Sequence, residues 1–399
     1  MNRYLSHKIE LRPTPEQEFF LRKSVGTSRF VYNSLLAEFS ERRDWSVKNA
    51  RAFLMNELRV EFPWIWDVSA DTPRTAISAL DNAFTRLWKK QGGFPNFKKK
   101  GVKDSFVIND SKKFSIIDRE LRIEKLKTRI KTREKLRLSG KPKNCTISYK
   151  AGKWFASIMV ELGDTSPWKP VEDQQRKPSV GVDMGILSLA VLSDGTEFPT
   201  SQPLKANLRK LKKLQRKMAR QVIGSSRREV TKRRIQKIHF KITCQRQATL
   251  HGLTDYLSRT YDRVVIEDLK PSNMMKNHRL ARAIADVGFY EFRRQMEYKS
   301  RFRGVELVIA DMWFPSSQLC SSCGHKQKMS LDKRTYVCGS CSYKIDRDLN
   351  AAINLNKYSP DRFKRDSKTH MEKCKTSTEA VSVKCELTQE TCYYGSEFL

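Results

Sequence analysis

The stretch that decides the fold reads CSSC at 320–323, CGSC at 338–341 and DRDLNAA at 346–352. Zinc takes four thiolates in a tetrahedron, and each Cys-x-x-Cys turn presents two sulfurs at short range. The spacing therefore predicts a zinc ribbon that holds one structural Zn²⁺. Because all four ligands come from the protein, this ion would do no chemistry. Redox pairs or two disulfides are the alternatives. The predicted ligands are Cys320, Cys323, Cys338 and Cys341.

Composition points to a polyanionic partner. The 399 residues carry 78 Lys and Arg against 44 Asp and Glu, a net charge of +34, while 39% hydrophobic residues support folded cores. Such a field attracts nucleic acid or, as the alternative, a membrane surface. The sequence has no run of 18 apolar residues and no signal-peptide core at its start, so we expect no membrane partner. Five cysteines lie scattered outside the ribbon, which favours free thiols in a reducing cytoplasm.

The first 166 residues predict a β-barrel interrupted by helices. Residues 3–12 alternate like a strand, and short strands recur between 105 and 162 with turn signals between them. Helical periodicity fills the region between them, at 13–43, 49–62 and 72–90. We therefore expect a barrel domain at 1–13 and 101–166, with a helical domain at 14–100 inserted in it. Residues 92–101 and 167–178 are read as linkers.

A third unit begins with two strands, at 180–186 and 187–192, and Asp194-Gly195 signals a hairpin after the second. Further buried strands are expected at 263–267 and 305–310. Residues 203–246 predict a helical hairpin with sixteen Lys and Arg against one acid, Glu229. Charged helix faces are usually only solvated, but here acids are nearly absent, which favours contact with phosphates. The polar segment 358–399 is expected to be a disordered tail.

Aromatic residues lie among the lysines that end the helical domain. Trp88, Phe94 and Phe97 alternate with Lys89, Lys90 and the lysines at 98–100. Such rings stack on bases in proteins that bind single strands. Packing in the core or the linker is an equally good interpretation.

Three acids predict a metal-dependent centre. Asp183 lies inside an apolar strand, Glu267 ends another, and Asp348 begins a helix. Carboxylates at the ends of buried strands are costly unless they are paired or bind a metal. Three of them from separate segments suit two Mg²⁺ ions that activate water at a phosphodiester. Singly, each is more often a cap or a salt-bridge partner, and Asp348 in particular suits a helix N-cap.

Taken together, these motifs resemble TnpB, the OrfB-type protein of insertion sequences, to which type V CRISPR effectors are related. The likeness covers roughly residues 1–356. It rests on GTSRFVYN (26–33), GFPNFK (93–98), GVDMG (181–185), VIEDLKPSNM (265–274), FPSSQLCSSCG (314–324) and DRDLNAA (346–352).

The resemblance implies a multidomain α+β and α/β fold: the barrel with its helical insertion, then an RNase H-like (RuvC) domain at 179–315 and 343–357 with the zinc ribbon at 316–342. It maps the catalytic, Mg²⁺-binding acids to Asp183, Glu267 and Asp348, with Asp346 the less suitable ligand. It implies an RNA-guided DNA endonuclease, a monomer in a ribonucleoprotein in the nucleoid-associated cytoplasm. The partners would be a noncoding guide RNA and target DNA beside a short adjacent motif. A non-cleaving regulator or a strand-transfer transposase is the alternative.

Overall fold

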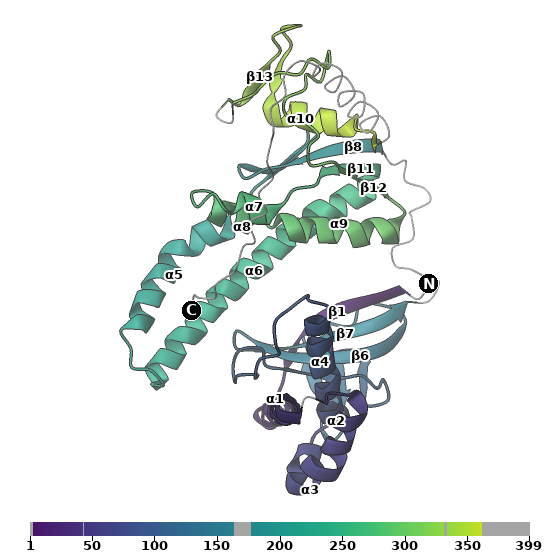
Figure 1. Cartoon of the computed structure of the whole chain (residues 1–399), viewed down its shortest axis with the longest axis vertical. Helices are drawn as coiled ribbons and strands as arrows, with labels where there is room; N and C mark the ends of the chain where they lie inside the picture. The colour runs from purple at the N-terminus through teal and green to yellow at the C-terminus, as the bar shows by residue number, and fades with distance from the viewer. Residues whose placement is uncertain (1–2, 43, 163–176, 331–332, 361–399) are drawn as a thin grey trace, which may run out of the picture. The chain divides into compact units, whose positions relative to one another are not determined.

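The protein, seen in a computed structural model, is described over residues 3–42, 44–162, 177–330 and 333–360 (Figure 1). Its contacts form two compact units. Unit 1 comprises Met1–Gln175, Ser201–Asp255 and Tyr298–Gly304, and unit 2 comprises Arg176–Thr200, Tyr256–Glu297 and Val305–Leu399. Among the described residues, none of the helices has both the length and the apolar character needed to cross a bilayer.

Unit 1 contains the predicted barrel. Its seven strands pair antiparallel in the order β2-β6-β7-β1-β5-β4-β3, a nearly closed sheet whose edges are β2 and β3. The first strand of the chain joins this sheet, as expected, and lies in its middle, with apolar residues such as Ile9 and Leu11 buried in the core. β5 was not predicted, since three residues are too short to show alternation. The strands are β1 (Arg3–Arg12), β2 (Ser105–Ile108), β3 (Phe114–Ile117), β4 (Glu120–Ile123), β5 (Ile130–Thr132), β6 (Lys141–Lys150) and β7 (Lys153–Leu162).

The helical insertion lies between β1 and β2 and has its own core. The long helix α1 (Pro15–Arg42) contributes Leu21 and Val25 to the barrel core and Val31 to Phe39 to the helical core. The single helix expected at 49–62 is broken into α2 (Val47–Phe53), a π-helical turn (Leu54–Leu58) and α3 (Arg59–Glu61). A 3₁₀ turn (Pro63–Trp66) and α4 (Asp71–Trp88) follow.

A long helical hairpin, α5 (Pro203–Ala219) and α6 (Ser226–Thr260), confirms the basic segment predicted at 203–246 (Figure 1). Leu211 of α5 packs against Ile235, Ile238 and Ile242 of α6, and Gly224 turns the chain with a φ of 84°. The second arm is longer than expected. It continues beyond Arg246 because the buried stripe goes on through Leu250, Leu253 and Leu257.

Unit 2 is built on a five-stranded sheet in the order β10-β9-β8-β11-β12. The first three strands form an antiparallel meander, and β11 pairs parallel with both β8 and β12. This is the RNase H-like arrangement that the resemblance implied. Helix α10 packs on β8 (Figure 1). The strands are β8 (Lys177–Met184), β9 (Ser188–Leu192), β10 (Glu197–Pro199), β11 (Tyr261–Glu267) and β12 (Glu306–Ala310), and the helices α7 (Pro271–Met274), α8 (Ala281–Val287), α9 (Phe289–Arg303) and α10 (Arg347–Asn356).

The ribbon adds a small two-stranded sheet, β13 (Thr335–Val337) and β14 (Lys344–Asp346), to unit 2. Of the linker predicted at 167–178, all but the last two residues lie outside the described residues, as does 361–399 of the predicted tail. Tyr358, placed in that tail by its polar surroundings, is buried and packs edge-on against Phe314, with ring centroids 4.9 Å apart. The packed fold thus extends at least to this residue.

Candidate active site and metal centre

The four predicted cysteines come together in unit 2. Their Sγ atoms all lie within 4.8 Å of one another. The closest pairs are Cys320 with Cys341 at 3.7 Å and Cys323 with Cys338 at 3.6 Å. These separations exceed the S–S bond of about 2 Å and match the roughly 3.8 Å edge of a tetrahedron built with Zn–S bonds of about 2.3 Å. The cluster therefore fits a structural zinc site, and the disulfide alternative does not hold.

The protein backbone also suits a metal-bound thiolate. The amide of Cys341 lies 3.5 Å from the sulfur of Cys338, and that of Ser340 lies 3.4 Å away. These N–H groups, that of Cys341 first, lower the pKa of the Cys338 thiol. After the first cysteine pair Gly324 adopts a positive φ of 76°, and after the second pair Ser342 does so at 57°.

Two buried asparagines fasten the ribbon to α10. Asn350 donates to the carbonyl of Leu319 at 2.7 Å and accepts from the amide of Ser321 at 2.9 Å. Asn354, one turn later, donates to Leu319 and to Ser316, both at 2.8 Å. The segment around the first cysteine pair and the first two turns of α10 thus form one hydrogen-bonded block. Sequence reasoning missed this role, although two asparagines four residues apart on an apolar helix are a signal for it.

The three predicted acids gather at one end of the unit 2 sheet. In the parallel pair β8–β11, Ile266 lies opposite Val182, so Glu267 and Asp183 follow at the same level. Helix α10 crosses β8 at Gly181, where an added Cβ would lie only 2.1 Å from the carbonyl oxygen of Ala352. Only glycine permits this approach. This close packing of α10 on β8 places Asp348, in the first turn of α10, at the same end of the sheet.

The electrostatics show that the three carboxyl groups interact. Burial raises the pKa of Asp183 well above its ordinary value, and the charges of Glu267 and then Asp348 raise it further. Burial also raises the pKa of Glu267, against a hydrogen bond that Ser316 donates to it. Negative charge is therefore concentrated in a poorly hydrated place, which favours protons or cations there.

The N-cap of α10 is Asp346. Its carboxylate accepts from the amides of Asp348 at 2.9 Å and Leu349 at 3.0 Å. The alternative that Asp348 serves as the cap is therefore wrong. The carboxylate of Asp348 instead lies 3.3 Å from Arg334, a ribbon residue that sequence reasoning did not single out.

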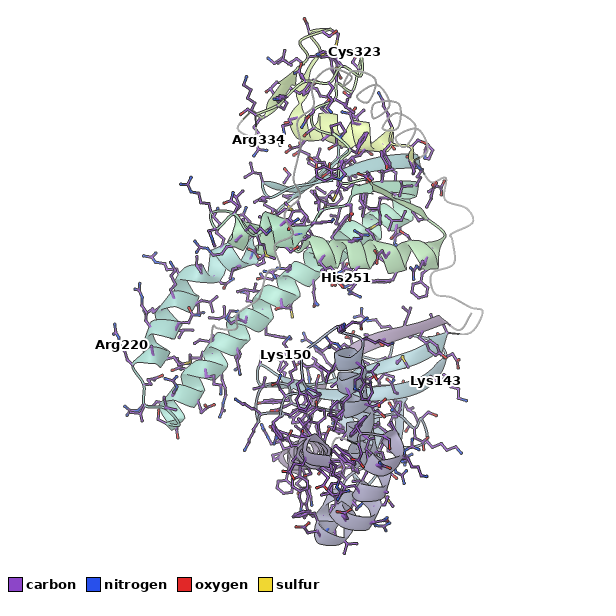
Figure 2. The ribbon with its side chains drawn as sticks, in the orientation of Figure 1. Lys143, Lys150, Arg220, His251, Cys323 and Arg334 are labelled. Atoms are coloured by element: carbon purple, nitrogen blue, oxygen red, sulfur yellow. The ribbon has the colours of Figure 1, made fainter. Side chains whose placement is uncertain are left out.

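Basic side chains cover the hairpin. Of its sixteen Lys and Arg, all but Arg228 and Arg246 are exposed, and Figure 2 labels Arg220 near the end of α5. The one acid, Glu229, pairs with Lys232 at 3.4 Å. Trp88, Phe94 and Phe97 are also exposed, by 60%, 55% and 56%. None of the three rings is therefore a core residue, but Trp88 and Phe94 each pack against Phe84, as the linker-packing alternative expects.

Comparison with protein families gives three matches along the chain. Residues 157–278 match a family described as "Probable transposase", and residues 289–355 match "Cas12f1-like, TNB domain". Residues 1–44 match "Helix-turn-helix domain", although the structure has strand β1 and a single long helix there.

One curated relative, "Putative RNA-guided DNA endonuclease InsQ" of Escherichia coli K12, is 32% identical over 377 residues, which cover 89% of this chain and 92% of that protein. A protein of Streptomyces pristinaespiralis, "Putative RNA-guided DNA endonuclease", is 33% identical over 358 residues, 87% of each chain. "TnpB-like protein L79" of Acanthamoeba polyphaga mimivirus is 24% identical over 46% of this chain and 38% of its own.

Among solved structures, a chain from "Cryo-EM structure of the Cas12f1-sgRNA-target DNA complex" matches with a TM-score of 0.54, over 86% of this chain and 83% of that one. At 14% identity, this match establishes a common fold alone. Identity of about one third along nearly the whole of two curated relatives goes further: the chain belongs to the TnpB (OrfB-type) family.

Proposed function

We propose that this protein is an RNA-guided DNA endonuclease, which cuts DNA complementary to a bound noncoding RNA beside a short adjacent motif. The observation that carries the proposal is the gathering of Asp183, Glu267 and Asp348 at one end of an RNase H-like sheet. The names of its full-length relatives support the same activity. Asp183, Glu267 and Asp348 are the residues to which we assign catalysis.

The donor set suits divalent magnesium. Three carboxylates from separate segments offer hard oxygen ligands. Burial raises the pKa of Asp183 and of Glu267, and neighbouring negative charge raises that of Asp183 further, so a bound cation would favour the ionised carboxylates. Bound Mg²⁺, two ions in this proposal, would supply a Lewis acid and an activated water at the phosphodiester.

Neighbouring side chains would orient the acids. Ser316 donates to Glu267 and fixes its carboxylate, while the backbone of Ser316 is itself held by Asn354. Arg334 holds Asp348 from the ribbon side. The ribbon would therefore position an acid and take no part in the reaction itself, as a closed zinc site implies.

The RNA partner is inferred from charge. The hairpin exposes fourteen Lys and Arg, which is far more positive charge than contacts with a short DNA duplex would use. We assign the hairpin to the backbone of the RNA–DNA heteroduplex, and the barrel domain (1–13, 101–166) and helical domain (14–100) to guide RNA and the duplex beside the target. The complex would contain one copy of the chain, acting on DNA in the nucleoid-associated cytoplasm.

Expression of the protein together with the DNA that flanks its gene tests this function. We expect a discrete RNA to copurify, and cleavage of those plasmids that match the 3′ end of that RNA and carry the adjacent motif. Protein stripped of RNA should bind DNA weakly and cut nowhere in particular. Site-specific cutting by RNA-free protein would support a strand-transfer transposase instead, and RNA-dependent binding without cutting would support a regulator.

A further inference from the structure

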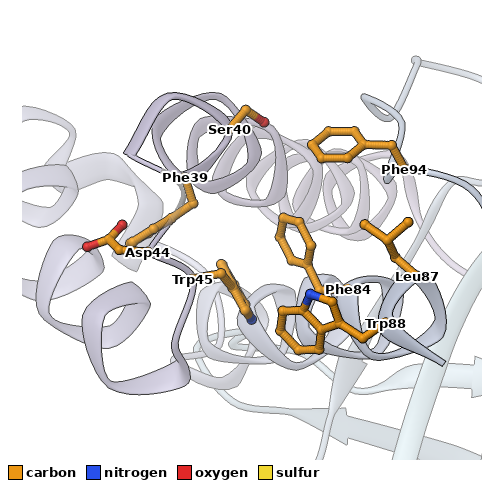
Figure 3. Close-up of a pocket in the computed structure, with 8 residues that line it drawn as sticks. All are labelled: Phe39, Ser40, Asp44, Trp45, Phe84, Leu87, Trp88 and Phe94. Carbon is orange, nitrogen blue, oxygen red and sulfur yellow. The ribbon is translucent and has the colours of Figure 1, made fainter.

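A pocket lined by aromatic rings lies in the helical domain of unit 1. Its volume is about 420 Å³, in the range of ligand sites. We call it the aromatic pocket and define it by five rings, which project into one space in Figure 3. They come from α1, from the loop before α2, from α4 and from the loop after α4. The rings are those of Phe39, Trp45, Phe84, Trp88 and Phe94.

The rings are arranged around Phe84, which is buried. Trp88 stacks on it at 5.8 Å with an interplanar angle of 20°, and Trp45 lies at 5.0 Å and 33°. Phe94 meets it edge-on at 5.9 Å. Phe39 and Phe84 are only 2% and 5% exposed, whereas Trp88 and Phe94 are 60% and 55% exposed. The pocket therefore has a fixed floor and two solvent-facing rings at its rim, a geometry that accepts a flat apolar group by stacking.

The positive charge beside the pocket indicates which class of ligand it would bind. Lys89 and Lys90 directly follow Trp88, and Lys99 and Lys100 follow Phe97, all of them exposed. An apolar partner protein gains little from such a rim, whereas a strand with phosphates on its backbone and flat bases meets both features. A base inside a duplex is already stacked and paired, so the base must be unpaired.

Three polar side chains of the lining already form hydrogen bonds. Ser40 donates to the carbonyl of Leu36, Asp44 accepts from Asn49 at 3.3 Å, and the indole N–H of Trp45 donates to Asp81 at 3.1 Å. Few groups remain to read the edge of a base. Binding would thus rest on stacking and tolerate different bases, as stacking platforms do.

We propose that the aromatic pocket holds one unpaired base of the resident RNA, clamped between Trp88 and Phe94, with the flanking phosphates on the exposed lysines after Trp88 and after Phe97. This inference rests on the proposed function for the presence of an RNA. It commits to RNA because recognition of RNA characteristically uses extruded bases of loops and bulges stacked on aromatic side chains.

The test uses the full chain without divalent metal and a short unstructured RNA that carries 2-aminopurine at its centre, whose fluorescence stacking quenches. Wild type should quench it. Trp88→Ala should raise the apparent Kd by about 5- to 150-fold, the range for loss of one stacked base. An RNA with an abasic site at its centre should bind wild type more weakly by the same factor in apparent Kd. The same RNA should bind Trp88→Ala no more weakly than the 2-aminopurine strand does. Neither readout requires cleavage, so the result is separable from failure of the nuclease proposal.

Matched variants separate stacking from folding. Trp88→Phe should restore quenching, Phe94→Ala should weaken it, and Phe19→Ala, which removes a 72% exposed ring on α1 outside the pocket, should leave it unchanged. The 2-aminopurine fluorescence should be quenched less in a DNA strand of the same sequence, and less in a duplex RNA. Equal quenching by Trp88→Ala and wild type, or DNA bound through Trp88 as well as RNA, would overturn the proposal. Loss of self-association in Trp88→Ala, with RNA binding intact, would assign the pocket to a second copy of the chain and also overturn it.

Discussion

Asn350 donates a hydrogen bond of 2.7 Å to the carbonyl oxygen of Leu319, which joins the helix that carries Asp348 to the residue before Cys320, the first cysteine of the cluster. Asn350 is fully buried, and its other amide atom accepts from Ser321. The placement of the third acid therefore depends on the ribbon, and the ribbon depends on α10.

Asn350→Ala should lower the free energy of unfolding by about 1–3 kcal/mol, because it leaves a buried amide and a buried carbonyl with fewer partners. All four cysteines remain, so zinc content should stay near one per chain while DNA cleavage falls. Elemental analysis and a cleavage assay on the same preparation check this. The control is Asn82→Ala, an exposed change on α4 that should alter neither quantity. Loss of zinc in parallel with cleavage would show that Asn350 maintains the ribbon itself.

Gly181→Ala should push α10 away from β8. The new Cβ would lie 2.1 Å from the carbonyl oxygen of Ala352 and 2.4 Å from the amide nitrogen of Asn356, both backbone atoms that cannot rotate away. We expect a stability loss of about 1–3 kcal/mol, the usual cost of overpacking, and slower cleavage. Gly252→Ala is the matched control. It lies in α6 with nothing within 4 Å of the new methyl, and should be neutral or stabilising by about 0.5–1 kcal/mol. Equal effects of the two changes would contradict the packing argument.

Cys338→Ser should reduce the zinc content below one ion per chain, because one of the four ligands is lost and metal binding supplies the folding energy of so small a loop. Cys244→Ser, at an exposed cysteine on α6 outside the cluster, should leave zinc unchanged. Full occupancy in Cys338→Ser would rule out this ligand set.

Asp71 makes the helical domain sensitive to acid. Burial raises the pKa of its carboxyl, but Lys113 at 2.6 Å and the amides of Asp110 and Asn109 outweigh burial and hold it below the usual range. A lowered folded-state pKa stabilises the protein above the unfolded pKa of about 3.9, and this contribution is lost as pH falls through the folded value.

Asp71→Asn should therefore destabilise the full chain by about 1–3 kcal/mol at neutral pH, and progressively less below about pH 4. Thermal unfolding of variant and wild type across this pH range measures the difference. The pair of Asp67 with Lys23 is the comparison, since Asp67 is 56% exposed and Asp67→Asn should cost no more than about 1 kcal/mol. A penalty for Asp71→Asn that stays constant into acid would refute the ionic origin of the effect.

Features with a local signature could be predicted from the sequence. The cysteine spacing, the alternating strands of the barrel and the apolar stripe of the hairpin each occupy a few neighbouring residues. What the sequence alone did not reveal depends on contacts between distant segments. Residue 181 must be glycine because the backbone of Ala352 lies against it, and Asn350 and Asn354 both donate hydrogen bonds to the carbonyl of Leu319. The acids were recognised as a set by their motifs, but their placement at one end of a sheet required the register of β8 against β11.

The central claim is that Asp183, Glu267 and Asp348 form the cutting centre. The most direct measurement compares cleavage and target binding for Asp183→Asn, Glu267→Gln and Asp348→Asn, each purified with its RNA, at fixed Mg²⁺. The cleavage rate of each variant should fall by more than about 100-fold, since loss of a residue that only supports a metal ligand typically costs about 10- to 100-fold. Target binding should stay largely intact. Asp346→Asn should be milder, since Asp346 caps α10. Near-normal cleavage by any of the first three variants, or a deeper loss in Asp346→Asn than in Asp348→Asn, would contradict this assignment.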